Sequence, residues 1–364
     1  MGEKEREERS FTEKLKFALN KGDVTTFKRL VKGGVDVNAK FWGKFPPIAG
    51  CMEEILILVL VVKQGNLELA GLTNSSTKYK STLLHEAVAI GNTEIVTLLL
   101  QNKAEVNAAN DDGRTPLHIA SRAGREVIVD ALLQSGARVN ACTVDGQTSL
   151  HVAVWQGREN VVRFLVAAAA DVNVQDGDGW TALYWAAKLN YLEITKTLVE
   201  AGAKLNFTVK NRGRSALLEA VDKGHVVLAE YLVRQGADVQ INAQGETVGS
   251  LLMKNIHIPP DIIMRTADFF IDAGYVIRND QCMSIVRKQK RLIENSDFLQ
   301  WINAKQSEVL SLANLCRICI RKYLIDCSDG RRISPLIRNL PVPKLLLDFL
   351  EFGQQSFSES DSVT

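Results

Sequence analysis

Apolar and polar residues follow a repeating pattern along the central part of the chain. The pattern starts again after 33, 33, 33 and 34 residues, each time at a threonine or a serine. The five starting residues are Thr82, Thr115, Thr148, Thr181 and Ser215. In each period two apolar-rich segments are separated by a glycine or an asparagine, which predicts two helices joined by a turn. We therefore expect an all-α protein built from consecutive helix pairs.

The residues at fixed positions in each period have the properties that a helix pair requires. The starting threonine or serine can cap the first helix, because its side-chain oxygen accepts a hydrogen bond from an unpaired backbone N–H. Pro116 suits the first helical turn, where no hydrogen-bond donor is lost. An alanine five residues after each start lets the two helices approach closely. A residue suited to a left-handed backbone then ends the first helix: Gly91, Gly124, Gly157, Asn190 or Gly224.

A second landmark keeps the same spacing near the end of each period. It has the form Ala-x-Val-Asn or a close variant, and its last residue is Asn107, Asn140, Asn173, Asn206 or Gln240. We interpret this polar residue as a turn residue. Apolar pairs on the second helix should face the neighbouring periods. Because one helix pair cannot bury its own apolar face, stacking of successive pairs must supply the core.

The segments Thr82-Leu-Leu-His85, Thr115-Pro-Leu-His118 and Thr148-Ser-Leu-His151 carry the clearest signature. With the alanine that follows each, they resemble the Thr-Pro-Leu-His-x-Ala motif of ankyrin repeats. The resemblance implies an ankyrin-repeat solenoid with five clear repeats and about seven in all. The additional repeats would be divergent units at 41–75 and 243–276.

The repeating pattern stops at about residue 278, and the segment 311–320 is of a different kind. Leu312, Cys316 and Ile320 are spaced by four and share one stripe of a predicted helix, with Leu315 beside them. We expect the neighbouring basic residues Arg317, Arg321 and Lys322 on the other face or at the helix end, where positive charge suits the helix dipole. The segment Leu340-Pro341-Val342-Pro343 begins twenty residues after Ile320 and precedes a short amphipathic helix predicted at 344–352.

These two motifs resemble the elongin BC box (311–320) and the cullin box (340–343) of a SOCS box. By this resemblance Leu312, Leu315, Cys316 and Ile320 would bind elongin C, and Leu340, Pro341, Val342 and Pro343 would bind cullin-5, although the motif does not exclude cullin-2. Cys316 would then be a small buried apolar residue and not a nucleophile. The predicted segments are a charged tail at 1–10, the repeat array at 11–278, a helical capping segment at 279–306, a three-helix SOCS box at 307–353 and a flexible tail at 354–364.

Taken together, the chain is identified as a member of the ankyrin repeat and SOCS box family. That resemblance implies a non-catalytic substrate-recognition subunit of a ubiquitin ligase, with elongin C and elongin B, cullin-5 and its RING-box protein as partners. A protein substrate would bind at the loop tips and the helix surface of the array. Exposed aromatic residues there are the strongest candidates, because aromatics anchor interfaces. The candidates are Asp112, Arg114, Asp145, Asp178, Trp180, Tyr184, Trp185, Arg212 and Arg214.

Composition and charge argue against a nucleic-acid-binding, membrane-spanning or secreted protein. A net charge of +2 gives no general reason to expect nucleic acid or an anionic membrane as partner. The charged first residues lack the apolar core of a secretory signal. The apolar run at 55–62 is far shorter than the roughly 20 residues needed to span a bilayer, so we interpret it as a buried helix. Six scattered cysteines do not form a secreted disulfide framework. We expect a cytoplasmic protein that could also enter the nucleus.

Two alternatives to the ligase hypothesis remain. The chain could be a plain ankyrin scaffold whose last helices only cover the array, or an enzyme with a site assembled from distant residues. The sequence contains no phosphate-binding loop, nucleophile elbow or zinc-protease motif, so we expect no catalysis and no cofactor. The histidines at 85, 118 and 151 could suggest a metal site, but each should instead bond to its own helix start. The Cys316–Cys319 pair lacks a second ligand pair at zinc-site spacing.

Overall fold

The computed structural model describes residues 82–101, 103–208, 213–240, 243–275, 282–307, 312–340 and 350. Every regular element in these ranges is a helix, and successive helices form pairs along the repeats. The pairs are α4 (Leu83–Ile90) with α5 (Thr93–Gln101), α6 (Pro116–Ala123) with α7 (Glu126–Gln134), α8 (Ser149–Trp155) with α9 (Glu159–Ala167), α10 (Ala182–Lys188) with α11 (Leu192–Glu200), α12 (Ala216–Asp222) with α13 (Val226–Gln235), and α14 (Val248–Lys254) with α15 (Pro260–Asp272). The predicted units and the apolar run that precede Thr82 lie outside these residues.

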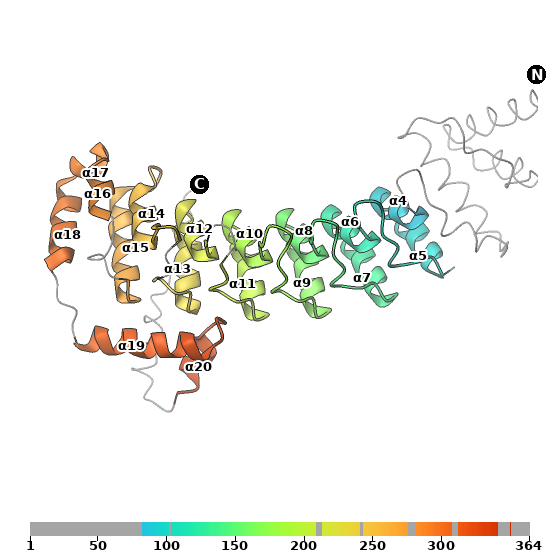
Figure 1. The fold of residues 1–364 in the computed structure, drawn as a ribbon. Helices are drawn as coiled ribbons and strands as arrows, with labels where there is room; N and C mark the ends of the chain where they lie inside the picture. Colours follow the sequence, from blue (N-terminus) through green and yellow to red (C-terminus); the bar gives the residue numbers. More distant parts are fainter. Residues whose placement is uncertain are drawn as a thin grey trace, which may run out of the picture. The chain divides into compact units, whose positions relative to one another are not determined.

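The structure divides into two compact units. The first includes α4, α5 and residues up to Ala120, together with Val127–Arg138. The second includes Ser121–Glu126 and the residues from Val139 onward. Within the second unit, α8, α10, α12 and α14 pack side by side in one layer, and α9, α11, α13 and α15 form a second layer (Figure 1). The apolar core lies between these layers, with Leu150, Leu183 and Leu217 almost fully buried.

The helix boundaries follow the predicted capping residues. The side chains of Thr148, Thr181 and Ser215 accept hydrogen bonds from backbone N–H groups three residues later. Asn190 has a φ of 61°, like the glycines that take its place in other repeats. An asparagine tolerates this left-handed conformation better than most residues, so the repeat that lacks the glycine keeps the same turn. The predicted caps at these three residues and the predicted turn at Asn190 are therefore confirmed.

The recurrent asparagine does more than form a turn. Asn173 Nδ2 donates to Gly202 O over 3.2 Å, and its Oδ1 accepts from Lys204 N over 2.8 Å. Asn206 Oδ1 accepts in the same way from Asp238 N over 2.8 Å. Each bond joins the loop of one repeat to the loop of the next. These side chains therefore connect neighbouring repeats, which their interpretation as turn residues alone did not predict.

The divergent unit at 243–276 forms a regular helix pair. Thr247 caps α14 by accepting a hydrogen bond from Ser250 N over 3.2 Å. Pro259 and Pro260 do not interrupt the unit, because they lie at the start of α15, where a helix tolerates proline. The predicted capping segment then contains α16 (Cys282–Val286), α17 (Lys290–Ile293) and α18 (Ser296–Ser307). Helix α18 packs on α15, with Phe298 fully buried.

The three histidines that recur every 33 residues bond to their own helix starts, as predicted. Thr82 N, Thr115 N and Thr148 N donate to the Nδ1 atoms of His85, His118 and His151 over 3.1, 3.1 and 3.3 Å. A backbone N–H can only donate, so each Nδ1 is an acceptor and carries no proton. Nε2–H of His151 is then the donor toward Trp180 O at 3.2 Å. His85 Nε2 donates in the same way to Arg114 O over 3.0 Å, so each of these two neutral histidines joins two successive loops.

This arrangement predicts that stability falls as the pH is lowered. Burial lowers the pKa of His85 and of His151 below the ordinary value of 6.5. The unfolded chain therefore binds protons below pH 6.5 that the native protein does not, and the free energy of unfolding decreases as the pH falls. We expect a loss of about 1 kcal/mol per histidine between pH 7.5 and 5.5. Urea denaturation at both pH values measures it. A His85→Asn/His151→Asn variant should show a smaller loss, and an equal loss would contradict the assignment.

The last described helices are α19 (Leu312–Cys327) and α20 (Ser334–Arg338). Residue 350 is helical, whereas most of the predicted third helix lies outside the described residues. No helix in the described parts of the chain is long and apolar enough to cross a membrane.

Candidate protein-interaction sites

One face of α19 is buried against the repeats. Leu324, Ile333, Ile337 and Leu350 form a small apolar core, and Leu340 packs against it. Backbone bonds tie this core to the array: Ile333 N donates to Gln235 O over 2.7 Å, and Leu205 N donates to Gly330 O over 2.6 Å. Lys204 pairs with Asp329 over 2.9 Å. The C-terminal helices are therefore attached to the loops that follow α11 and α13.

Arg321 lies at the centre of this attachment, and only 2% of its surface is exposed. Its Nη2 donates to Val233 O on α13 over 2.7 Å, and its Nη1 donates to Leu350 O over 2.9 Å. Arg321 therefore lies on the face of α19 opposite Ile320, as predicted, but this face is buried and packs against the repeats, which the sequence did not predict. A guanidinium group can satisfy several carbonyl oxygens at once, so it can be buried where a lysine would leave acceptors unpaired.

The opposite face of α19 is exposed. Ile320 is 36% exposed and Tyr323 is 68% exposed, and both Cys319 and Cys327 are also exposed. Tyr323 and Cys327 continue the stripe that begins at Leu312, because they follow Ile320 by three and seven residues. The sequence interpretation stopped at Ile320 and missed them, although continuing the same spacing would have found both. The side chains of Leu312, Leu315 and Cys316 lie outside the described residues, as do Pro341, Val342 and Pro343.

A group of aromatic side chains lies on the first-helix layer of the second unit. We call Trp155, Trp180 and Trp185 the tryptophan cluster. The rings of Trp155 and Trp185 stack with centroids 5.3 Å apart and planes 11° from parallel. Lys188 Nζ lies 4.6 Å from the centroid of Trp185, within the range of a cation–π interaction. Trp155 is 49% exposed, which is unusual for so large an apolar side chain.

The prediction of an exposed Tyr184 is wrong. The residue is only 3% exposed, and its hydroxyl donates to Glu219 Oε2 over 2.6 Å. Trp155 takes the exposed position instead, at the end of α8, and the sequence analysis did not select it. The sequence did contain a signal for it: Trp155 lies seven residues after the starting Thr148 and two before Gly157, which ends the first helix of the repeat.

Arg214 is held by three carboxylates next to the tryptophan cluster. Its Nη1 lies 3.3 Å from Glu219 and 3.1 Å from Asp222, and its Nη2 pairs with Glu246. Burial opposes the charged form of Arg214, but the hydrogen bonds and charges of Glu246 and Asp222 outweigh burial and raise its pKa. We call these four residues the Arg214 network. With Lys188 and Lys223 they line an open cleft of about 530 Å³.

Comparison with known protein families gives two matches. The family model for ankyrin repeats matches residues 54–143, 84–176 and 150–243, more than half of the chain. The SOCS box model matches residues 308–351, which include α19 and α20. The chain belongs to the ankyrin repeat and SOCS box family. A comparison with curated proteins gives no match.

The remaining substrate-binding candidates of this ankyrin repeat and SOCS box protein differ in their surroundings. Asp145 and Asp178 are exposed on loops of the second unit, whereas Asp112 and Arg114 belong to the first unit and pair with each other over 3.5 Å. Trp180 and Trp185 are partly buried within the tryptophan cluster. Arg212 lies outside the described residues.

Chemically, the family's two modules are interaction modules and not catalytic ones. Across the part of the chain that the structure describes, no three histidine, cysteine or acidic side chains converge to hold a metal ion. The geometry is suited to binding proteins at two places, the outer face of α19 and the tryptophan cluster.

Proposed function

We propose that this protein is the substrate-recognition subunit of an elongin B/C–cullin-5–RING ubiquitin ligase. The SOCS box would bind elongin C through the stripe on α19, and the cullin through residues 340–343. The repeats would bind a target protein, and the cullin-bound RING-box protein would bring a charged ubiquitin-conjugating enzyme close to it. Proximity then makes transfer to a substrate lysine effectively intramolecular. On this proposal the chain itself catalyses no reaction and works in the cytoplasm.

The observation that carries this proposal is the exposed face of α19 within a matched SOCS box. Ile320 and Tyr323 remain exposed although the opposite face of the same helix is well packed. A helix that served only to cover the array would have little reason to present an isoleucine and a tyrosine to solvent. The alternative of a plain scaffold does not account for this second apolar face.

Affinity capture of the full chain, with detection of elongin C and cullin-5, tests the proposal. The wild type should capture both proteins, and a Leu312→Ala/Cys316→Ala variant should capture neither. Truncation of buried interface anchors costs about 2 kcal/mol each, so the affinity should fall more than about 100-fold. Lys322→Ala/Asp326→Ala is a matched control, because both side chains are exposed on α19 away from the stripe. If the wild type fails to capture elongin C, the ligase proposal is wrong and the plain ankyrin scaffold becomes the better account.

The same capture can separate the two binding functions. A Trp155→Ala/Trp185→Ala variant removes most of the exposed surface of the tryptophan cluster but leaves α19 unchanged. It should retain elongin C and cullin-5 while the ubiquitinated proteins that accumulate with the wild type decrease. An unchanged set of ubiquitinated proteins would place substrate recognition elsewhere on the repeats.

A further inference from the structure

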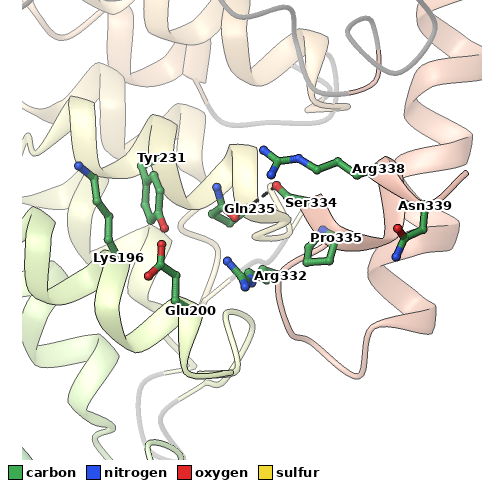
Figure 2. A pocket seen from close by; sticks show the side chains of 9 residues that line it. All are labelled: Lys196, Glu200, Tyr231, Gln235, Arg332, Ser334, Pro335, Arg338 and Asn339. Atoms are coloured by element: carbon green, nitrogen blue, oxygen red, sulfur yellow. Dashed lines mark hydrogen bonds between the residues drawn. The ribbon is translucent and has the colours of Figure 1, made fainter. Parts of the chain in front are cut away.

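A second cleft, of about 400 Å³, lies where the SOCS box meets the repeats (Figure 2). One wall comes from α11 and α13, and the other from the segment that leads into and includes α20. Three of its lining side chains are basic and one is acidic. The lining residues are Lys196, Glu200, Tyr231, Gln235, Arg332, Ser334, Pro335, Arg338 and Asn339.

Two arginines give this cleft its positive charge. Figure 2 shows the side chains of Arg332 and Arg338 directed toward the array, on either side of the bond from Ser334 Oγ to Gln235 Oε1, which measures 3.3 Å. Lys196 also lines the cleft and pairs with Glu193 over 2.7 Å. Burial, together with the nearby charge of Glu200, raises the pKa of Tyr231 to about 12, so its phenol stays a hydrogen-bond donor at neutral pH. The cleft therefore offers donors and excess positive charge.

Such a cleft suits carboxylates on an extended segment. A guanidinium group presents paired N–H donors that match the two oxygens of a carboxylate, and charge-assisted bonds of this kind are the stronger ones. Two arginines on the same wall could engage two acidic side chains of one peptide. A free small anion would fill only part of the volume.

The chain itself carries a matching segment. Residues 351–364 contain Glu351, Glu359 and Asp361 and no lysine or arginine. The segment follows Leu350, which packs in the same small core as Ile333, the residue after Arg332. Glu359 is nine positions after Leu350, and an extended chain of that length spans about 30 Å. The acidic residues can therefore reach the cleft.

We propose that the acidic segment 351–361 binds in this cleft, with Glu359 and Asp361 paired to Arg332 and Arg338. This interaction goes beyond the proposed ligase function and does not depend on it. Asn339 lines the cleft and directly precedes Leu340, so the bound segment would lie beside the first residue of the predicted cullin box. The tether keeps the segment at a high effective concentration, which compensates for the modest strength of exposed ion pairs.

Binding of a fluorescent peptide with the sequence of residues 351–364 tests the proposal on the full-length chain. A Glu359→Gln/Asp361→Gln chain should leave the cleft open and bind the peptide. The wild-type chain should bind it at least about tenfold more weakly, because its own segment competes. Adding Arg332→Gln/Arg338→Gln to the open chain should weaken binding at least about tenfold, and a peptide with Gln at both acidic positions should bind poorly.

The control adds Arg163→Gln/Lys290→Gln to the open chain, which removes two exposed positive charges outside the cleft and should leave the affinity unchanged. Circular dichroism and thermal unfolding establish that each variant is folded. Equal peptide affinity for the wild-type and open chains would overturn binding of the segment within its own chain. Equal loss in the Arg332/Arg338 and control variants would mean that the peptide responds to net charge alone, and no binding to the open chain would also overturn the proposal.

Discussion

Replacing Arg321 with methionine should loosen the attachment of the SOCS box to the repeats and lower stability by about 3 kcal/mol. The substitution removes two charge-assisted hydrogen bonds, of 2.7 Å to Val233 O and 2.9 Å to Leu350 O. Bonds of this kind contribute about 1.5–3 kcal/mol each, and methionine leaves buried carbonyl oxygens with fewer donors. Its similar length and apolar character limit the cavity, so lost hydrogen bonding should dominate.

Hydrogen exchange measures this effect where it is expected. Amides of α19 and α20 should lose protection in Arg321→Met, while those of α8–α11 should remain as in the wild type. Lys322→Met is the matched control, because Lys322 directly follows Arg321 and is exposed. This substitution should change the free energy of unfolding by less than about 0.5 kcal/mol. Equal effects of the two substitutions would mean that the buried guanidinium contributes nothing specific.

Replacing Arg214 with methionine should destabilise the fifth clear repeat and the divergent unit at 243–276 that follows it, by about 2–3 kcal/mol. The change leaves Glu219, Asp222 and Glu246 close together without their shared cation, and the side chain of Glu219 is only 5% exposed. Loss of one partner from a fully buried pair costs about 3–5 kcal/mol. The smaller figure applies here because the side chains of Asp222 and Glu246 are 25% and 30% exposed, so solvent screens part of the interaction.

The pH dependence of this loss distinguishes its cause. Although burial opposes it, the hydrogen bond and charge of Arg214 lower the pKa of Glu246. A lowered carboxyl pKa adds stability above the unfolded-state value, and that stability disappears as the pH falls through the folded-state value. The difference between wild type and Arg214→Met in urea denaturation should therefore be full at pH 7 and shrink below about pH 4.5.

Arg114→Met provides the control at the equivalent position of another repeat. Arg114 also precedes a helix-starting threonine, but it pairs with Asp112 at 3.5 Å, and the two side chains are 42% and 64% exposed. We expect a change below about 0.5 kcal/mol, as for most exposed pairs. A loss as large as that of Arg214→Met would show that the register position, and not the three carboxylates, determines the cost.

The sequence by itself determined the helix pairs, their boundaries and the family. Thr148, Thr181 and Ser215 cap their helices, and Asn190 takes the left-handed turn, because these features depend on a few residues close in the chain. The spacing of Leu312, Cys316 and Ile320 likewise predicted a helix, which α19 confirms. The residues that bind a substrate or a cullin stay predictions, since no observation tests them.

Only the tertiary structure decided how equivalent positions differ. Arg114, Trp180 and Arg214 each precede a helix-starting residue, yet the first forms an exposed pair, the second joins the tryptophan cluster and the third is surrounded by carboxylates. The sequence did not predict the burial of Arg321, because that burial depends on Val233, 88 residues away. Local rules fix where a helix begins and ends, whereas the burial and charge of a side chain depend on neighbours that only stacking and packing bring together.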